Sequence, residues 1–230
     1  MTENKKENLN NRMIKFLFEG APVRGACVQM AEEWQEMIKF HHYPENVAAL
    51  LGQFTAGALL LSSTIKFEGS LILQVKGSGP IAFIYAEVRN PMSVRAMTEI
   101  REGAEIKPEM DLQELINKDG KGLCALILDP KDRRPGVQPY QGMVSLESNS
   151  VAENLENYMA KSEQLETKLY LAADCKKLGG LVIQKMPSVG GNVSEISDPD
   201  AWGRIMQLAH TVTKEELLNV PATDVLHRLF

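Results

Sequence analysis

The stretch VAALLGQFTAGALLLSSTI, residues 47–65, decides the fold, because it runs for nineteen residues without a charge. It holds twelve apolar residues, two glycines and five Gln, Thr or Ser residues. A membrane span needs about 20 mostly apolar residues, so the stretch is marginal for that role, and no other segment resembles it. A core helix buried on most sides is the better interpretation. Pro44 suits its first turn, and we expect no contact with a membrane.

Patterns typical of strands lie on both sides of this helix. Residues 14–18 and 23–30 predict two strands before it. After residue 69 the apolar residues alternate, which predicts a meander of strands. The continuous apolar run at 122–128 predicts a strand that is covered on both faces. We also expect a short helix from residue 31, a strand at 140–146, an amphipathic helix at 150–163 and a final hairpin that ends near residue 187. Residues 1–187 therefore predict one core domain of α+β class, with a largely antiparallel sheet packed with helices.

The last part of the chain, residues 188–230, predicts a small helical linker domain. Pro, Gly, Ser and Asn dominate residues 187–200, as in a linker. Thr213 and Glu216 have the spacing of a capping box, and Pro221 begins a further helix. A segment this short cannot build a core of its own. We expect it to dock on another surface and to be the part of the fold that unfolds most easily.

Charge and cysteine usage exclude several classes of function. The net charge of -5 and the pI near 5.5 argue against a nucleic-acid binder, which needs a basic face. The polar N-terminus lacks the apolar region of a secretory signal. Cys27, Cys124 and Cys175 are far apart and form no CxC or CxxC pair, so they predict no zinc site and no disulfide framework. We expect a cytoplasmic protein with no metal or cofactor bound by this chain.

Ser63 and Lys66 form an S-x-x-K tetrad, which offers an alternative function. In penicillin-recognising enzymes this spacing places a nucleophilic serine one helical turn from a lysine. The companion motifs S-D-N and K-T-G do not occur in this chain. The tetrad also falls at the end of the long helix, where a lysine suits the carbonyl end of the helix dipole. A serine-dependent enzyme that uses Ser63 and Lys66 is therefore the alternative to a non-enzymatic protein.

From about residue 12 to residue 230 the sequence resembles one known family. The stretches that carry the resemblance are FLFEGAPVRGACV, HHYPENVAALLGQFTAGALLLSSTIKFEGSLILQVKGSGPI, YQGMVSLES, YMAKSEQLETKLYL, GGLVIQKMP and EELLNVPATDVLHRLF. They are similar to the redox-regulated chaperones of the heat shock protein 33 family. The resemblance implies a holdase that works without ATP, binds unfolding proteins under oxidative or heat stress and prevents their aggregation. It also implies a homodimer, and we hypothesise that the linker domain can be swapped between its subunits.

The resemblance further implies a C-terminal zinc domain, in which CxC and CxxC thiolates bind zinc and form disulfides on oxidation. None of those four cysteines is present, so we expect zinc only in a domain that this chain lacks. We also expect that the chain was cut just before that domain. The expected client-binding or masking residues lie in the linker domain: Trp202, Ile205, Met206, Leu217 and Leu218.

Overall fold

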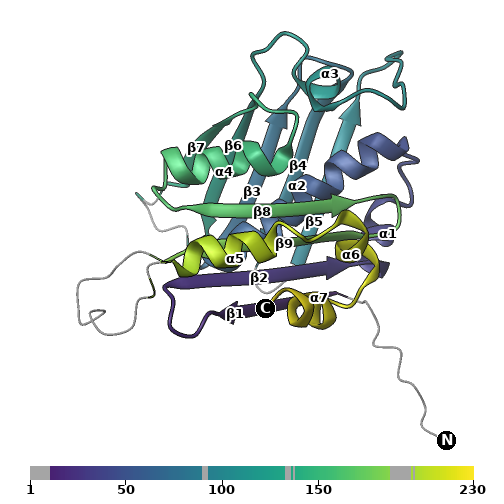
Figure 1. Cartoon of the computed structure of the whole chain (residues 1–230). Helices are drawn as coiled ribbons and strands as arrows, with labels where there is room; N and C mark the ends of the chain where they lie inside the picture. Colours follow the sequence, from purple (N-terminus) through teal and green to yellow (C-terminus); the bar gives the residue numbers. More distant parts are fainter. Residues whose placement is uncertain (1–10, 90–92, 133–135, 137, 187–197, 199) are drawn as a thin grey trace, which may run out of the picture.

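A long helix held between two antiparallel sheets forms the centre of the computed structural model, which describes residues 11–89, 93–132, 136, 138–186, 198 and 200–230 (Figure 1). This helix, α2 (Glu45–Thr64), buries fourteen of its residues and packs on strands of both sheets. It is long and apolar enough to cross a membrane, but 78% of its most apolar window is buried inside the protein. The burial supports the interpretation of α2 as a core helix.

The first sheet, called sheet A here, joins the beginning of the core to its end. Its strand order is β1-β2-β9-β8, and every neighbouring pair is antiparallel. The strands are β1 (Arg12–Leu17), β2 (Val23–Met30), β8 (Thr167–Ala173) and β9 (Leu178–Lys185). The β2–β9 pairing therefore brings together segments about 150 residues apart.

The second sheet, called sheet B here, contains the strands of the predicted meander, but the meander is interrupted after β5, because β6 pairs with β3. Its strand order is β5-β4-β3-β6-β7, and it is also antiparallel throughout. The strands are β3 (Gly69–Lys76), β4 (Ile81–Arg89), β5 (Ser93–Ile100), β6 (Leu123–Pro130) and β7 (Tyr140–Ser145). The α+β class is thus confirmed, but the strands divide between two sheets where we expected one. The division follows from α2, which needs an apolar surface on two opposite sides.

The prediction that residues 122–128 are covered on both faces is wrong. In β6 only alternate side chains, such as Cys124 and Leu126, face the core. Leu123 points to the other face of sheet B and is 46% exposed. Met97 of β5 and Met143 of β7 are similarly exposed. The continuous apolar run therefore reflects an apolar outer face of sheet B.

Helices flank the sheets, and the last three of them form a separate layer. The core helices besides α2 are α1 (Glu32–Ile38), α3 (Leu112–Ile116) and α4 (Val151–Lys161). The layer at the end of the chain contains α5 (Ala201–Ala209), α6 (Lys214–Asn219) and α7 (Ala222–Leu229). We call residues 200–230 the arm; it lies on the face of sheet A that is turned away from α2 (Figure 1). The predicted domain boundary at residues 187 and 188 lies outside the described residues.

Candidate client-binding surface beneath the arm

The outer face of sheet A is an apolar platform. The side chains that make it alternate along their strands with side chains that face α2. Because both faces are covered, almost all of β2 is buried. The fully buried members of the platform are Val23 and Cys27 from β2, Ala172 from β8, and Leu181 and Ile183 from β9.

The arm covers this platform with one apolar side of each helix. Ile205 and Ala209 of α5, Leu217 of α6, and Val225 and Leu229 of α7 are buried against it. These residues share one apolar cluster with sheet A, so the arm has no core that is separate from the sheet. The predicted docking of the short helices is what the structure shows.

All five predicted client-binding or masking residues belong to this cluster. Ile205 is 7% exposed and Leu217 only 2%, while Trp202, Met206 and Leu218 are partly buried against the same residues. Lys185 of β9 lies over the Trp202 ring, with its ammonium nitrogen 5.0 Å from the ring centroid. The structure thus brings the five residues together at the contact between the arm and sheet A.

Hydrogen bonds inside the arm hold α6 and α7 as a unit. Thr213 Oγ1 accepts from Glu216 N at 3.2 Å, and Glu216 Oε2 accepts from Thr213 N at 2.9 Å, which confirms the predicted capping box. Arg228 of α7 donates to Glu216 Oε2 at 3.0 Å and to Thr211 Oγ1 at 3.2 Å. The Thr213 hydrogen bonds and the Arg228 charge both hold the pKa of Glu216 below its usual value.

Sequence reasoning missed one residue at this contact, Gln29 of β2. Its side-chain Nε2 donates to Leu217 O at 2.9 Å and to Val220 O at 2.7 Å, and its Oε1 accepts from Ala222 N at 2.9 Å. The available signal was a lone amide in the apolar strand VRGACVQM. Gln29 therefore joins sheet A to the turn between α6 and α7.

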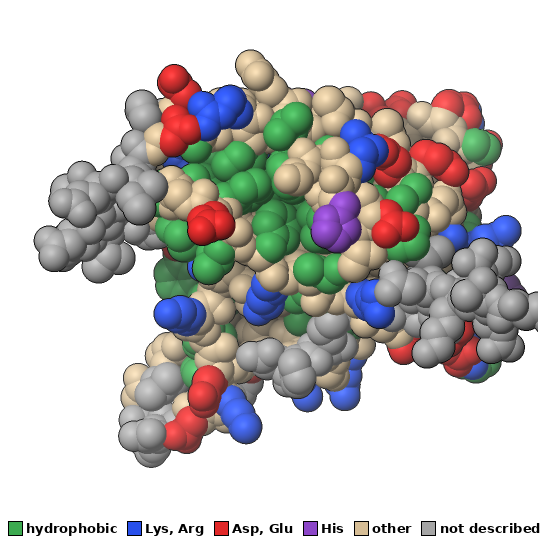
Figure 2. All heavy atoms as spheres, turned by 60° about the horizontal axis from the view of Figure 1, so that its bottom comes forward, with side chains coloured by type: hydrophobic (Ala, Val, Ile, Leu, Met, Phe, Trp, Pro, Cys, Tyr) green, Lys and Arg blue, Asp and Glu red, His purple; other side chains and the backbone are tan. Residues whose placement is uncertain are grey.

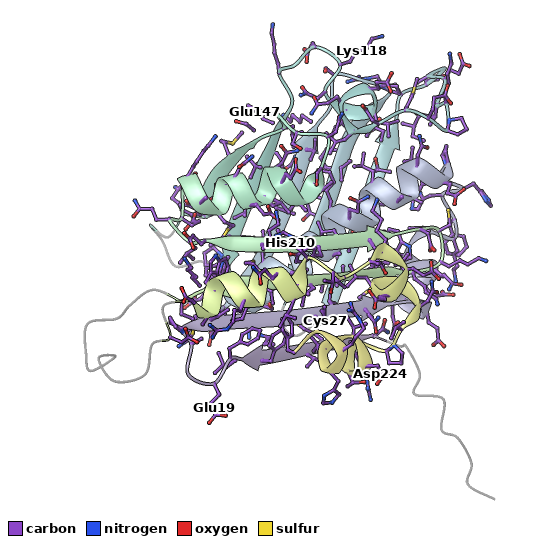
Figure 3. The ribbon with its side chains drawn as sticks, in the orientation of Figure 1. Glu19, Cys27, Lys118, Glu147, His210 and Asp224 are labelled. Atoms are coloured by element: carbon purple, nitrogen blue, oxygen red, sulfur yellow. The ribbon has the colours of Figure 1, made fainter. Side chains whose placement is uncertain are left out.

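The three cysteines lie at three different depths. Cys27 is buried between sheet A and the arm, and burial raises its pKa to about 12 (Figure 3). Cys124 is buried in the main core, and burial raises its pKa to about 12 as well. Cys175 is exposed in the β8–β9 turn. Within the described part of the chain no three His, Cys, Asp or Glu side chains gather as a metal site would need. These thiols therefore do not fit the zinc site that the family resemblance implies.

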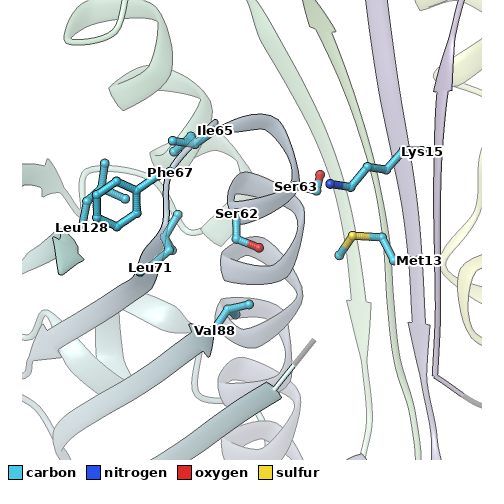
Figure 4. Close-up of a pocket in the computed structure, with 10 residues that line it drawn as sticks. Met13, Lys15, Ser62, Ser63, Ile65, Phe67, Leu71, Val88 and Leu128 are labelled. Atoms are coloured by element: carbon cyan, nitrogen blue, oxygen red, sulfur yellow. The ribbon is translucent and has the colours of Figure 1, made fainter. Parts of the chain in front are cut away.

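Ser63 does not pair with Lys66. Ser63 Oγ donates to Leu60 O at 2.6 Å within the last turn of α2, and Lys66 lies beyond the helix and is exposed. Ser63 does line a cavity of about 380 Å³ between α2, β1 and sheet B. The amine that points toward it there is Lys15 of β1 (Figure 4). The structure thus lends no support to a catalytic Ser63–Lys66 pair.

Apolar side chains also remain on the outer surface around the arm. Figure 2 shows hydrophobic side chains gathered on the face of the molecule that carries β1 and the arm. Leu17 of β1, Leu208 of α5 and Phe230 belong to the exposed large hydrophobic residues. Phe230 packs its ring edge-on against Phe18 at a centroid distance of 4.8 Å. The last residue of the chain is thereby held against the β1–β2 hairpin.

Comparisons with known proteins agree with this architecture. The family model described as Hsp33 protein matches residues 11–230. A 33 kDa chaperonin of Methylobacillus flagellatus is 38% identical over 223 residues, which cover 96% of this chain and 72% of that protein. A 33 kDa chaperonin of Neisseria gonorrhoeae is 40% identical over 97% of this chain and 70% of its own length. The crystal structure of a 33 kDa chaperonin from Thermotoga maritima has the same fold, with a TM-score of 0.72 at 22% identity, covering 95% of this chain and 74% of that one.

Proposed function

This chain belongs to the Hsp33 family, and we propose that it is a holdase chaperone that works without ATP. The names of its relatives support a chaperone role. In this proposal the chain binds unfolding proteins in the cytoplasm under oxidative or heat stress and keeps them from aggregating. Unfolded polypeptides are its partners; nucleic acids and membranes are not.

One observation carries the proposal: an apolar platform on sheet A is covered by an arm that has no separate core. When the arm detaches, Val23, Leu181 and Ile183 would come into contact with water. Exposed apolar surface of this kind binds apolar segments of other chains. In the closed state Trp202, Ile205, Met206, Leu217 and Leu218 mask the platform, and in the open state they add apolar surface of their own.

The Gly-rich segment KGSGP, residues 76–80, supports activity without a nucleotide. It forms the tight turn between β3 and β4, whereas a phosphate-binding loop leads from a strand into a helix. Gly77 N donates to Ala82 O at 2.9 Å, and the Arg101 side chain donates to the carbonyls of Gly77 and Gly79. The turn is thus held by the protein's own groups.

No step of the proposal runs through zinc. Redox control by a zinc domain is what the family resemblance implies, but Cys27, Cys124 and Cys175 form no CxC or CxxC pair, and Cys27 and Cys124 lie in different apolar clusters. We therefore propose that opening of the arm in this chain depends on how strongly the arm docks. Oxidation of a zinc site is not required for it.

We also propose that the chain forms a homodimer in which the arm can dock on sheet A of a second copy. The platform and the arm are complementary surfaces of the same chain, so an arm that has detached from its own sheet fits the sheet of a partner equally well. Static light scattering at increasing protein concentration checks this. A mass that stays at that of one chain would contradict it.

The test of the function is the light scattering of a thermally unfolding client enzyme. We expect the 230-residue chain to suppress client aggregation without oxidant, and Ser63→Ala to suppress it equally well. Suppression that appears only after oxidation would contradict control by arm docking. Labelling by an acyl-serine probe that disappears in Ser63→Ala would favour the enzyme alternative instead.

A further inference from the structure

We propose that Gln29 and Gly179 form a polar catch that fixes the arm on sheet A and sets how readily it opens. Gln29 is only 4% exposed and lies among apolar side chains of sheet A and the arm. A buried amide is costly unless its hydrogen bonds are made. In the closed protein both of its Nε2 protons and its Oε1 have partners, and all three partners are backbone groups of the arm.

The partners of Gln29 are groups that helices cannot satisfy by themselves. In a continuing helix Leu217 O would accept from the amide of residue 221, but Pro221 has no N–H. Ala222 N is the first amide of α7 and lacks a partner within that helix. One side chain of sheet A thus caps the end of α6 and the start of α7.

Gly179 of β9 makes room for this contact. It lies directly opposite Gln29 in the antiparallel register of β2 and β9. A Cβ atom at Gly179 would lie 2.2 Å from Leu217 O, so any larger residue would push α6 off the sheet. The absence of a side chain at Gly179 lets the Leu217 carbonyl approach sheet A closely enough to accept the hydrogen bond from Gln29.

The catch selects one position of the arm. If α6 slid along the platform, apolar contacts could re-form, but the Gln29 amide and the ends of two helices would lose their partners. The side-chain hydrogen bonds between Tyr170 and His210 and from Lys177 to Asn219 also reach the arm, but they lie at exposed positions. Gln29 is therefore a positioning residue for the masked state, and this role rests on the proposed function.

The chain contains its own probes of arm opening. Cys27 becomes accessible when the arm leaves sheet A, Cys124 only when the main core unfolds, and Cys175 is exposed throughout. Alkylation with N-ethylmaleimide, followed for each cysteine by mass spectrometry, reports the three events separately. We expect Gln29→Leu to speed the alkylation of Cys27 about 10- to 100-fold, because two buried backbone groups and one that is partly buried lose their partners. The rate at Cys124 should change much less.

Gln184→Leu is the matched control. Gln184 is a fully buried glutamine of the same sheet, but it bonds Arg24 and Thr167 on the face that the arm does not touch. The Gln184→Leu variant should not speed the alkylation of Cys27 relative to that of Cys124. Gly179→Ala should speed the alkylation of Cys27 as Gln29→Leu does. It replaces Gln29→Leu as the test variant if that protein fails to fold. Unchanged Cys27 rates in both catch variants would overturn the proposal.

The proposed function is tested separately with the same variants. If Gln29→Leu exposes Cys27 and suppresses client aggregation more strongly, both the catch and the proposed function are supported. If it exposes Cys27 without a gain in suppression, the catch is correct and the masked platform is not the client site. If suppression rises while Cys27 stays protected, the catch is wrong.

Discussion

Cys27 and Gln29 lie two residues apart on the same face of β2, and closing of the arm has a different effect on each of them. Gln29 gains three hydrogen bonds when the arm closes. Cys27 gains only burial, which raises its pKa to about 12. Burial of this kind favours the neutral thiol over the thiolate. The closed arm therefore excludes the reactive form of Cys27.

This pKa predicts that arm docking weakens at alkaline pH. Above the ordinary thiol pKa of about 8.5 an exposed Cys27 loses its proton, while the buried one keeps it up to about pH 12. The closed state then binds one proton more than the open state, so docking loses about 1.4 kcal/mol for each pH unit in this range. The contribution of Cys27 to the free energy of arm docking is fully present below the ordinary pKa of its thiol. It falls as the pH rises above that value.

Urea titrations of a Trp34→Phe variant at about pH 9 and 10 check this slope, because its fluorescence then comes from Trp202 in the arm and not from the main core. Cys27→Ala should flatten the slope and Cys175→Ala should keep it. The pKa of Tyr170 is also raised to about 12, first by burial and then by Glu156, but its ordinary value near 10 keeps it neutral in most of this range. An equal slope in Cys27→Ala would contradict the prediction.

At the scale of elements, the stability of the arm helices depends more on how their ends are capped than on how long they are. The helices α5, α6 and α7 have nine, six and eight residues, and isolated helices shorter than about 12 residues are marginal in water. Capping of the helix ends and docking on sheet A must therefore supply the remaining stability. The Thr213–Glu216 capping box was visible in the sequence, because its two residues are close neighbours. The cap that Gln29 provides was not visible, because its partners lie more than 180 residues away.

Removing the capping box should open the arm and leave the core intact. Thr213→Ala deprives Glu216 N of its acceptor, which costs about 1 kcal/mol. We expect the alkylation of Cys27 to rise about fivefold, with little change at Cys124. Ser150→Ala removes the corresponding cap of α4 in the core, where Ser150 Oγ accepts from Glu153 N at 3.3 Å, and should not act selectively on Cys27. A Thr213→Ala variant that speeds both thiols alike would show that the arm and the core open together.

The whole molecule consists of four layers, which are sheet B, the helix α2, sheet A and the arm, and its side chains are buried to different depths. Local periodicity predicted α2, the strands of sheet B and the short C-terminal helices, because each pattern lies within one segment. The division into two sheets could not be predicted in this way, since it depends on the long-range pairing of β2 with β9. The surroundings of Ser63 could not be predicted for a similar reason: Lys66 is near it in the sequence, but Lys15 points toward it across the fold.

The different depths at which the three cysteines are buried predict the order in which their thiols react in the unaltered chain. Cys175 should react at once, Cys27 at a rate set by arm opening, and Cys124 only at the rate of global unfolding. Urea far below the midpoint of the main unfolding transition should accelerate Cys27 before Cys124. Alkylation of the three peptides over time at several urea concentrations measures this. Identical rates at Cys27 and Cys124 would mean that the arm does not open by itself.

The pairing of β2 with β9 also has a consequence for synthesis on the ribosome. Val23, Cys27 and Gln29 are made long before the neighbouring strand β9 at residues 178–185, and the arm is made after β9. Throughout most of translation the platform is therefore incomplete and uncovered, in a chain that is still growing. Each nascent copy thus exposes an apolar surface before the arm can close over it, so the protein itself needs protection from premature association until the arm has emerged.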